Sequence, residues 1–236
     1  MNEYEFFEDY YKKGKDAWEI FSNQVRTEKF FKRVKIVKEF LKNTKLKNPL
    51  ILDIGCGNGE FAKFINEKNL IGLDISYKAV KNAKKSINFS VVGNAIKLPF
   101  KNESFDVVLC IETLYYQNKN KMIKEIYRVL KKKGFLILSL GNQNSIRKKI
   151  YQLIKKDVEE NIIYSKNKKK WEEKRYYPFE LKNLFKQHKF KILTYKGILF
   201  DLPLLSRYKI IRNFFLFPLG NIFKNYSNQI VFFMRK

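Results

Sequence analysis

The feature that most constrains the fold is an alternation of short apolar runs with helical patterns between Leu50 and Leu140. Apolar runs predict strands, and apolar residues at helical spacing predict helices. Strands joined through helices in units this short run parallel, which predicts an α/β sheet with helices on both faces. The predicted strands are 50–54, 70–74, 87–92, 105–111, 135–140, 190–196 and 230–234, and the predicted helices are 28–41, 60–67, 77–85, 122–130 and 178–188.

A glycine-rich turn follows the first predicted strand. Gly55, Gly57 and Gly59 occupy alternate positions just before the predicted helix that begins at Glu60. Because glycine has no side chain, the backbone can approach a ligand closely there, and the next helix offers N–H groups at its start. The spacing lacks the third glycine of the G-x-G-x-x-G pattern, which disfavours NAD and leaves another nucleotide-type ligand. Helix–strand packing alone is the alternative use of such a turn.

A carboxylate ends the second predicted strand. Asp74 lies 74 − 53 = 21 residues beyond Asp53, at the carboxyl end of the neighbouring strand. An acid placed there can accept hydrogen bonds from ribose hydroxyls. The alternative is an N-cap for the helix that begins near Tyr77. Together with the glycine turn, this position favours ribose binding.

Four segments carry a family resemblance: ILDIGCGNGEF, IGLDIS, GNAIKLPFKNESFDVV and IYRVLKKKGFLIL. In their order and spacing they resemble the small-molecule class I methyltransferases that use S-adenosyl-L-methionine (SAM), over about Leu50 to Leu140. The resemblance implies SAM as cofactor and methyl transfer by in-line displacement as the reaction. It also implies a Rossmann-like, mostly parallel seven-stranded sheet with an antiparallel last strand.

The resemblance assigns roles to individual residues. The turn glycines wrap the methionine part of SAM, Asp53 organises the turn, and Asp74 holds the ribose. Asn94 and Ala95 lie around adenine, where the family uses an acid, so an uncharged amide weakens recognition there. The expected cofactor-binding residues are Asp53, Gly55, Cys56, Gly57, Gly59, Asp74, Ile75, Asn94, Ala95 and Ile111.

The catalytic candidates follow the strand 105–111, at the edge that faces the transferable methyl in this family. They are Glu112 and Tyr116, although Glu112 has the alternative of anchoring a neighbouring helix. Some quinone-type relatives carry a further Glu and His here, where this chain has Tyr115 and Tyr116, and no metal site is expected. The only histidine, His188, fits a cap at a helix-to-strand turn. Methyl transfer needs little acid–base help, because the sulfonium already activates the methyl group and alignment supplies much of the rate.

The length of 236 residues fits one α/β domain with appendages. We expect a single domain over 1–236, with an N-terminal helical lid (1–48), a cofactor-binding core (49–141) and acceptor-site insertions (142–177 and 198–228). Aromatic residues near the N-terminus either close the lid over the cofactor or simply pack: Phe6, Phe7, Tyr10, Tyr11 and Trp18.

The second insertion places basic residues, Arg207, Lys209 and Arg212, between two apolar clusters. If the apolar clusters pack over the core, they simply line it and form no interaction surface. If they stay exposed, they can enter a lipid headgroup region while the basic residues meet anionic phosphates. The expected acceptor is a small molecule or a lipid-linked compound, with peripheral contact to an anionic membrane in the second case. The aromatic residues of the second cluster are Phe214, Phe215 and Phe217.

The charge leaves other functions open. Lys and Arg number 49 against 23 Asp and Glu, a net charge of +26 that attracts any polyanion. A compositional bias spread over every surface is the competing explanation. An RNA methyltransferase is the alternative enzyme, although no appended RNA-binding module is recognisable. A non-catalytic SAM-binding regulatory or scaffold module is the alternative from another class.

The expected location is cytoplasmic, at the membrane surface if the acceptor is lipid-linked. Cys56 and Cys110 lie in unlike settings, so no disulfide is expected and a reducing compartment fits. The first eleven residues are acidic and aromatic, unlike a signal peptide. No apolar stretch reaches the ~18 residues of a membrane span.

Overall fold

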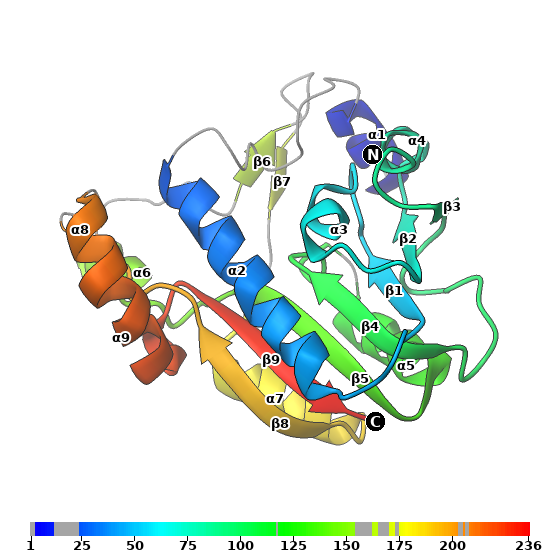
Figure 1. Ribbon diagram of the computed structural model, residues 1–236. Helices are drawn as coiled ribbons and strands as arrows, with labels where there is room; N and C mark the ends of the chain where they lie inside the picture. Colours follow the sequence, from blue (N-terminus) through cyan, green and yellow to red (C-terminus); the bar gives the residue numbers. More distant parts are fainter. Residues whose placement is uncertain are drawn as a thin grey trace.

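The computed structural model describes residues 3–11, 24–116, 118–153, 162–164, 170–172, 175–202, 205 and 208–236, with 162–164 and 170–172 described as backbone only. Its main feature is a seven-stranded sheet in the order β3-β2-β1-β4-β5-β9-β8 (Figure 1). Strand β9 runs antiparallel to both β5 and β8, and the other strands run parallel. The predicted Rossmann-like class is confirmed. The strands are β1 (Ile51–Ile54), β2 (Leu70–Asp74), β3 (Phe89–Val92), β4 (Phe105–Ile111), β5 (Leu130–Gly141), β8 (Lys191–Gly197) and β9 (Gln229–Arg235), with a separate hairpin of β6 (Ile162–Tyr164) and β7 (Lys170–Glu172).

Helices cover both faces of the sheet (Figure 1). On one face, α2 and α3 pack their apolar residues against inward-facing residues of β1, β4, β5 and β9. On the other face, α5 and α7 pack against the alternate residues of the same strands. Both faces of a parallel sheet are therefore buried, as crossover connections require. The helices are α1 (Glu3–Tyr11), α2 (Gln24–Asn43), α3 (Glu60–Ile65), α4 (Tyr77–Ala83), α5 (Lys119–Val129), α6 (Ile146–Leu153), α7 (Pro178–Gln187), α8 (Lys209–Ile211), the π-helical turn η2 (Arg212–Leu216), α9 (Phe217–Ile222) and the 3-10 turn η3 (Lys224–Tyr226).

The structure extends or shortens several predicted elements. Strands β2 and β4 have their predicted bounds, whereas β5 begins at Leu130 rather than Phe135, because Leu130 already pairs with Phe105. Beyond this pair the register shifts in a β-bulge, where Lys133 has a φ of 63°, a left-handed conformation that favours glycine. Helix α2 spans four residues more at its start than predicted, from Gln24 instead of Glu28.

The two insertions contain regular elements of their own. The segment 198–228 holds α8, η2 and α9, which follow one another without a break. The insertion 142–177 holds α6 and the β6–β7 hairpin. Both follow the carboxyl ends of β5 and β8, so they begin at the edge of the sheet where the parallel strands end. Cys56 and Cys110 are separate, buried and free, as expected. Among the helices described, none has the length and apolarity needed to cross a bilayer.

Candidate cofactor and acceptor site

The glycine turn joins β1 to α3 in a conformation that only glycine adopts readily. Gly55, Gly57 and Gly59 have φ values of 73°, 53° and 82°, and left-handed backbone costs other L-residues roughly 1–2 kcal/mol each. The turn bends towards the end of β2, because the Gly55 N–H donates to the Leu73 carbonyl at 2.7 Å. Further along the turn, the Gly57 N–H donates a hydrogen bond to Oδ2 of Asp74 at 2.9 Å. The predicted turn and the predicted acid therefore meet.

Two buried carboxylates lie beneath this turn. Asp74 also accepts the Ser76 N–H at 3.0 Å, and burial raises its pKa to about 6 although the hydrogen bonds from Ser76 and Gly57 oppose the shift. Asp53 is 2% exposed, and burial, followed by repulsion from Asp74, raises its pKa to about 7. Its Oδ2 atom has no hydrogen-bond partner among the residues described. Both groups are thus held in a setting that a nearby positive charge would stabilise.

Helix α1 lies against the glycine turn and α4. The Glu8 carboxylate accepts the Ser76 Oγ–H at 2.7 Å and the Lys78 N–H at 3.1 Å. A Cβ atom added at Gly57 would lie 2.9 Å from the Tyr11 hydroxyl. Of the expected lid aromatics, Phe6 is fully buried and the Phe7 ring lies 5.1 Å from that of Tyr116, whereas Trp18 is outside the described residues.

The residues expected around adenine form a tight turn after β3. The Asn94 Oδ1 accepts the Ile96 N–H at 3.0 Å, and the Lys97 N–H donates to the Asn94 carbonyl at 3.0 Å. Ala95 is buried. The Asn94 side chain therefore supports its own turn, and its amide nitrogen is the group left to meet a ligand. The remaining predicted residues, Ile75 and Ile111, follow β2 and end β4 and are half-buried.

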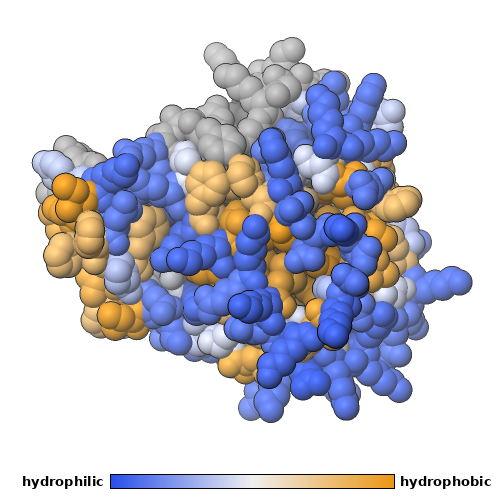
Figure 2. All heavy atoms as spheres, viewed as in Figure 1, coloured by the Kyte–Doolittle hydropathy of each residue, from blue (hydrophilic) through white to orange (hydrophobic). Residues whose placement is uncertain are grey.

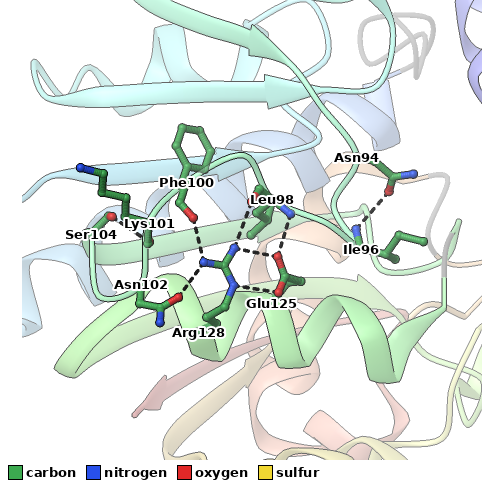
Figure 3. A network of polar contacts seen from close by, with 9 residues as sticks. All are labelled: Asn94, Ile96, Leu98, Phe100, Lys101, Asn102, Ser104, Glu125 and Arg128. Carbon is green, nitrogen blue, oxygen red and sulfur yellow. Dashed lines mark hydrogen bonds and ion pairs between the residues drawn. The ribbon is translucent and has the colours of Figure 1, made fainter.

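An ion pair on α5 holds the loop that follows this turn (Figure 3). Arg128 donates to Glu125 through Nε and Nη2, each at 2.8 Å, and also to the carbonyls of Leu98 at 3.0 Å and Phe100 at 2.7 Å. Glu125 in turn accepts the Leu98 N–H at 2.8 Å. Sequence reasoning missed this clamp. Its only signal was an acid and a base three residues apart on a helix, a spacing that is common on surfaces.

Glu112 is the centre of a polar cluster at the carboxyl end of β4. Its carboxylate accepts hydrogen bonds from the hydroxyls of Tyr115 at 2.7 Å and Ser139 at 2.9 Å, and from the Gln229 amide at 3.3 Å. Arg33 of α2 completes the set at 3.4 Å. Glu112 itself has a φ of 56°, strained for a residue with a side chain. The cluster ties α2, β4, β5 and β9 together, which favours the anchoring interpretation of Glu112.

The other candidates lie apart from this cluster or within the core. Tyr116 is 8% exposed, and its ring meets those of Phe7 and Tyr115. His188 caps the end of α7, before β8, and hence lies at the opposite edge of the sheet. Within the described ranges, no three His, Cys, Asp or Glu residues gather as metal ligands would.

A groove of about 690 Å³ opens between α3 and α4. Its lining includes Asn58, Lys63, Lys78 and Asn82, and none of the residues expected to bind cofactor. The groove therefore borders the glycine turn at Asn58 without including the residues expected to bind the cofactor.

The comparisons with known proteins agree with this geometry. The family model described as "Methyltransferase domain" matches residues 52–138. A solved SAM-dependent methyltransferase of Thermotoga maritima, described as a "possible histamine N-methyltransferase", shares the fold with a TM-score of 0.69. It is 24% identical and the match covers 99% of both chains.

Curated relatives match over the same core. An uncharacterized protein of Methanocaldococcus jannaschii is 36% identical, over 56% of this chain and 61% of that protein. The tRNA (carboxymethyluridine(34)-5-O)-methyltransferase of Arabidopsis thaliana is 32% identical, over 39% of this chain and 24% of that protein. Phthiotriol/phenolphthiotriol dimycocerosates methyltransferase 1 of Mycobacterium ulcerans is 31% identical, over 40% and 38%. Matches span 49% to 61% of the length of the three M. jannaschii relatives.

The matched residues 52–138 hold both the glycine turn and Asp74, so the family and the geometry point to the same part of the molecule. Residues 52–138 of the chain therefore match the methyltransferase-domain family, on a fold that the chain shares with solved SAM-dependent methyltransferases.

Proposed function

We propose that this protein transfers the methyl group of SAM to a small-molecule or lipid-linked acceptor. The observation that carries the proposal is the contact between the glycine turn and Asp74, where the Gly57 N–H and the Asp74 carboxylate are 2.9 Å apart. At this contact, a turn whose backbone can approach a ligand closely lies beside a buried hydrogen-bond acceptor, at the carboxyl edge of the sheet.

The residues at this edge fit SAM. The turn of Gly55, Gly57 and Gly59 offers backbone without side chains to the methionine part, and Asp74 offers oxygens to the ribose hydroxyls. The unpartnered buried Oδ2 of Asp53 fits a cationic ligand nearby, because a positive charge keeps a buried carboxylate ionised. Asn94 and Ala95 would border adenine, on a loop that Arg128 holds in place.

The contribution of the chain to the reaction is then positional. When bound, SAM supplies an electrophilic methyl group, and the protein has to align the acceptor atom with it and exclude water. Glu112 has four partners and acts as an anchor for this edge, rather than as a base with a free oxygen. Within the N-terminal region 1–48, α1 acts as the lid, because it lies on the glycine turn, whereas α2 packs against the sheet.

The proposal is tested by binding and by labelling. Titration calorimetry should give a heat of binding with SAM and with S-adenosylhomocysteine. Incubation with methyl-labelled SAM and a cell extract should then place the label in the organic-soluble or small-molecule fraction. Absence of SAM binding by a folded protein contradicts the proposal, and binding without labelling of any fraction favours the non-catalytic SAM-binding module.

RNA is the second candidate acceptor. The net charge of +26 favours it, as does the similarity to the tRNA methyltransferase of A. thaliana, although that match covers only 24% of the plant protein. The same labelling experiment distinguishes the two acceptors. Label in the RNA fraction, lost on ribonuclease treatment, would replace the small-molecule or lipid-linked acceptor with RNA.

A further inference from the structure

The helical segment 209–222 is apolar on two opposite sides. It comprises α8, η2 and α9 and lies at one end of the molecule beside α2 (Figure 1). Its inner side buries Leu216 and Phe217 in the core beneath α2. An amphipathic surface helix would carry mainly polar residues on the opposite side, whereas here large apolar residues are exposed beside the polar Lys209, Asn213 and Asn221.

The opposite side exposes large apolar residues, which we call the outer helical face. Ile210, Phe214 and Ile222 recur at spacings of four and eight residues and are 72%, 73% and 68% exposed. Phe215 is 61% exposed and Phe223 47%. Figure 2 shows hydrophobic residues gathered over α8 and α9. Contiguous exposed apolar residues of this kind mark an interaction surface rather than ordinary scatter.

The surroundings of the outer helical face are basic. The sequence contains no Asp or Glu after Asp201. Lys209 is exposed within the face, and the Lys149 ammonium of α6 lies 4.8 Å from the ring of Tyr226 at its border. The fully buried Asp201 is held internally, by Arg147 and Asn228 at 3.0 Å each.

The face is also fixed in its outward orientation. Arg212, on the inner side of the same helix, is 1% exposed and pairs with Glu28 of α2 through both Nε and Nη2. Turning the outer side inward would break this buried pair, which is strongly unfavourable. The pair therefore holds the apolar side chains of the outer helical face towards solvent.

We infer that the outer helical face docks on an anionic membrane surface. Phenylalanine and isoleucine side chains enter the boundary between headgroups and acyl chains, while neighbouring lysines meet lipid phosphates. Of the three phenylalanines singled out in the sequence, Phe214 and Phe215 belong to this surface and Phe217 belongs to the core. The surface lies outside the cofactor site, so docking does not depend on methyl transfer.

The test is flotation of the full chain with vesicles of phosphatidylcholine alone and of phosphatidylcholine with phosphatidylglycerol. The wild type should bind the anionic vesicles and bind the neutral ones more weakly. The variant F214S/F215S should lose about ten-fold or more in apparent affinity, because two apolar side chains no longer enter the lipid. The matched control is F89S/F179S, which makes the same change at residues 72% and 62% exposed on β3 and α7. The control should bind like the wild type.

Each opposite outcome overturns the inference. It fails if the wild type does not bind anionic vesicles, if F214S/F215S binds them equally well, or if the control loses as much. It also fails if sedimentation shows a wild-type dimer that F214S/F215S abolishes, because a second copy of the chain then covers the face. Circular dichroism checks that both variants are folded. Vesicle binding is measured without SAM or acceptor, so failure of the proposed function is seen separately in the calorimetric and labelling experiments.

Discussion

The two ends of the carboxyl edge are built in different ways. At the β1–β2 end, the site comes from loops that directly follow strands, and its central contact joins Gly57 to Asp74 across neighbouring strands. At the β4–β5–β9 end, side chains distant in sequence meet: Arg33, Glu112 and Gln229 come from α2, β4 and β9. The first end depends on backbone conformation, and the second depends on buried charge pairs.

This difference has a consequence for substitutions. Where backbone makes the site, one added side chain blocks the ligand while most of the fold is kept. Where buried charges make the site, removal of one partner leaves another charge uncompensated and lowers the stability of the whole domain. Variants at the two ends should therefore separate binding from stability.

The largest effect is expected from Gly57→Val. Valine is strained at a φ of 53°, and its side chain would fill the space between the turn and the Tyr11 hydroxyl. We expect no SAM binding detectable by calorimetry, with a far-ultraviolet circular dichroism spectrum like that of the wild type. Asn58→Ala, in the same turn, is the control and should bind SAM. Normal SAM affinity in Gly57→Val would remove the turn from the cofactor site.

The second effect is on stability at the other end. Glu112→Ala leaves Arg33 without its carboxylate, and we expect a loss of about 3 kcal/mol in the free energy of unfolding. For a domain of this size, Tm should fall by about 6–12 °C in thermal denaturation. Glu39→Ala is the control, because Glu39 pairs with Lys196 on the surface and such pairs contribute about 0–1 kcal/mol. If Glu112→Ala kept its Tm and its SAM binding but lost methyl transfer, Glu112 would act as a base. The distinction between the two ends of the carboxyl edge would then be wrong.

The β1–β2 end was predictable because its signals are local. A glycine at a left-handed position and an acid at a strand end can both be recognised within a few residues of sequence. The same holds for β2 and β4, whose apolar runs gave the correct bounds. The predicted start of β5 was wrong because Leu130 already pairs with Phe105, five residues before the apolar run that begins at Phe135.

The other end was not predictable because its partners are far apart in sequence. Nothing near Glu112 indicates that Arg33 and Gln229 will meet it, 79 and 117 residues away (112 − 33 and 229 − 112). The segment 198–228 was ambiguous for a similar reason. The helical segment 209–222 has apolar residues on both sides, so their spacing does not indicate which ones turn inward. The packing of Leu216 and Phe217 in the core and the pairing of Arg212 with Glu28 decide it.

The third-largest effect is expected on SAM binding at the β1–β2 end, without a role in the stability comparison. Asp74→Ala should weaken SAM binding by about 1.5–3 kcal/mol, roughly 10- to 150-fold in Kd, because charge-assisted hydrogen bonds to the ribose are lost. Calorimetry measures it. The matched control is Asp106→Ala, since Asp106 also accepts a backbone N–H and pairs with a lysine, but at the start of β4 on the opposite edge. Asp106→Ala should lower Tm and leave Kd unchanged, and equal losses of affinity in both variants would contradict the ribose role of Asp74.

The smallest effect is the pH dependence of the same interaction. Burial raises the pKa of Asp74 to about 6, and only the ionised carboxylate accepts two ribose hydrogen bonds. SAM affinity is therefore complete well above pH 6 and is lost as pH falls, by about twofold at pH 6 and about tenfold at pH 5 relative to pH 8. Stability runs in the opposite direction. Since the pKa of Asp74 is higher in the folded chain than its ordinary value of 3.8, the folded chain binds more protons between these values, and this group lowers the free energy of unfolding as pH rises from about 4 to 6.

These opposite signs allow the two contributions to be measured apart, by calorimetry with SAM and by denaturation without it. Asp74→Ala should flatten both profiles. Asp53→Asn should keep the fall in affinity between pH 8 and pH 5, because Asp53 is expected to organise the turn rather than touch the ribose. An affinity profile that is flat in the wild type, or that disappears in Asp53→Asn, would mean that Asp74 is not the titrating group in the cofactor site.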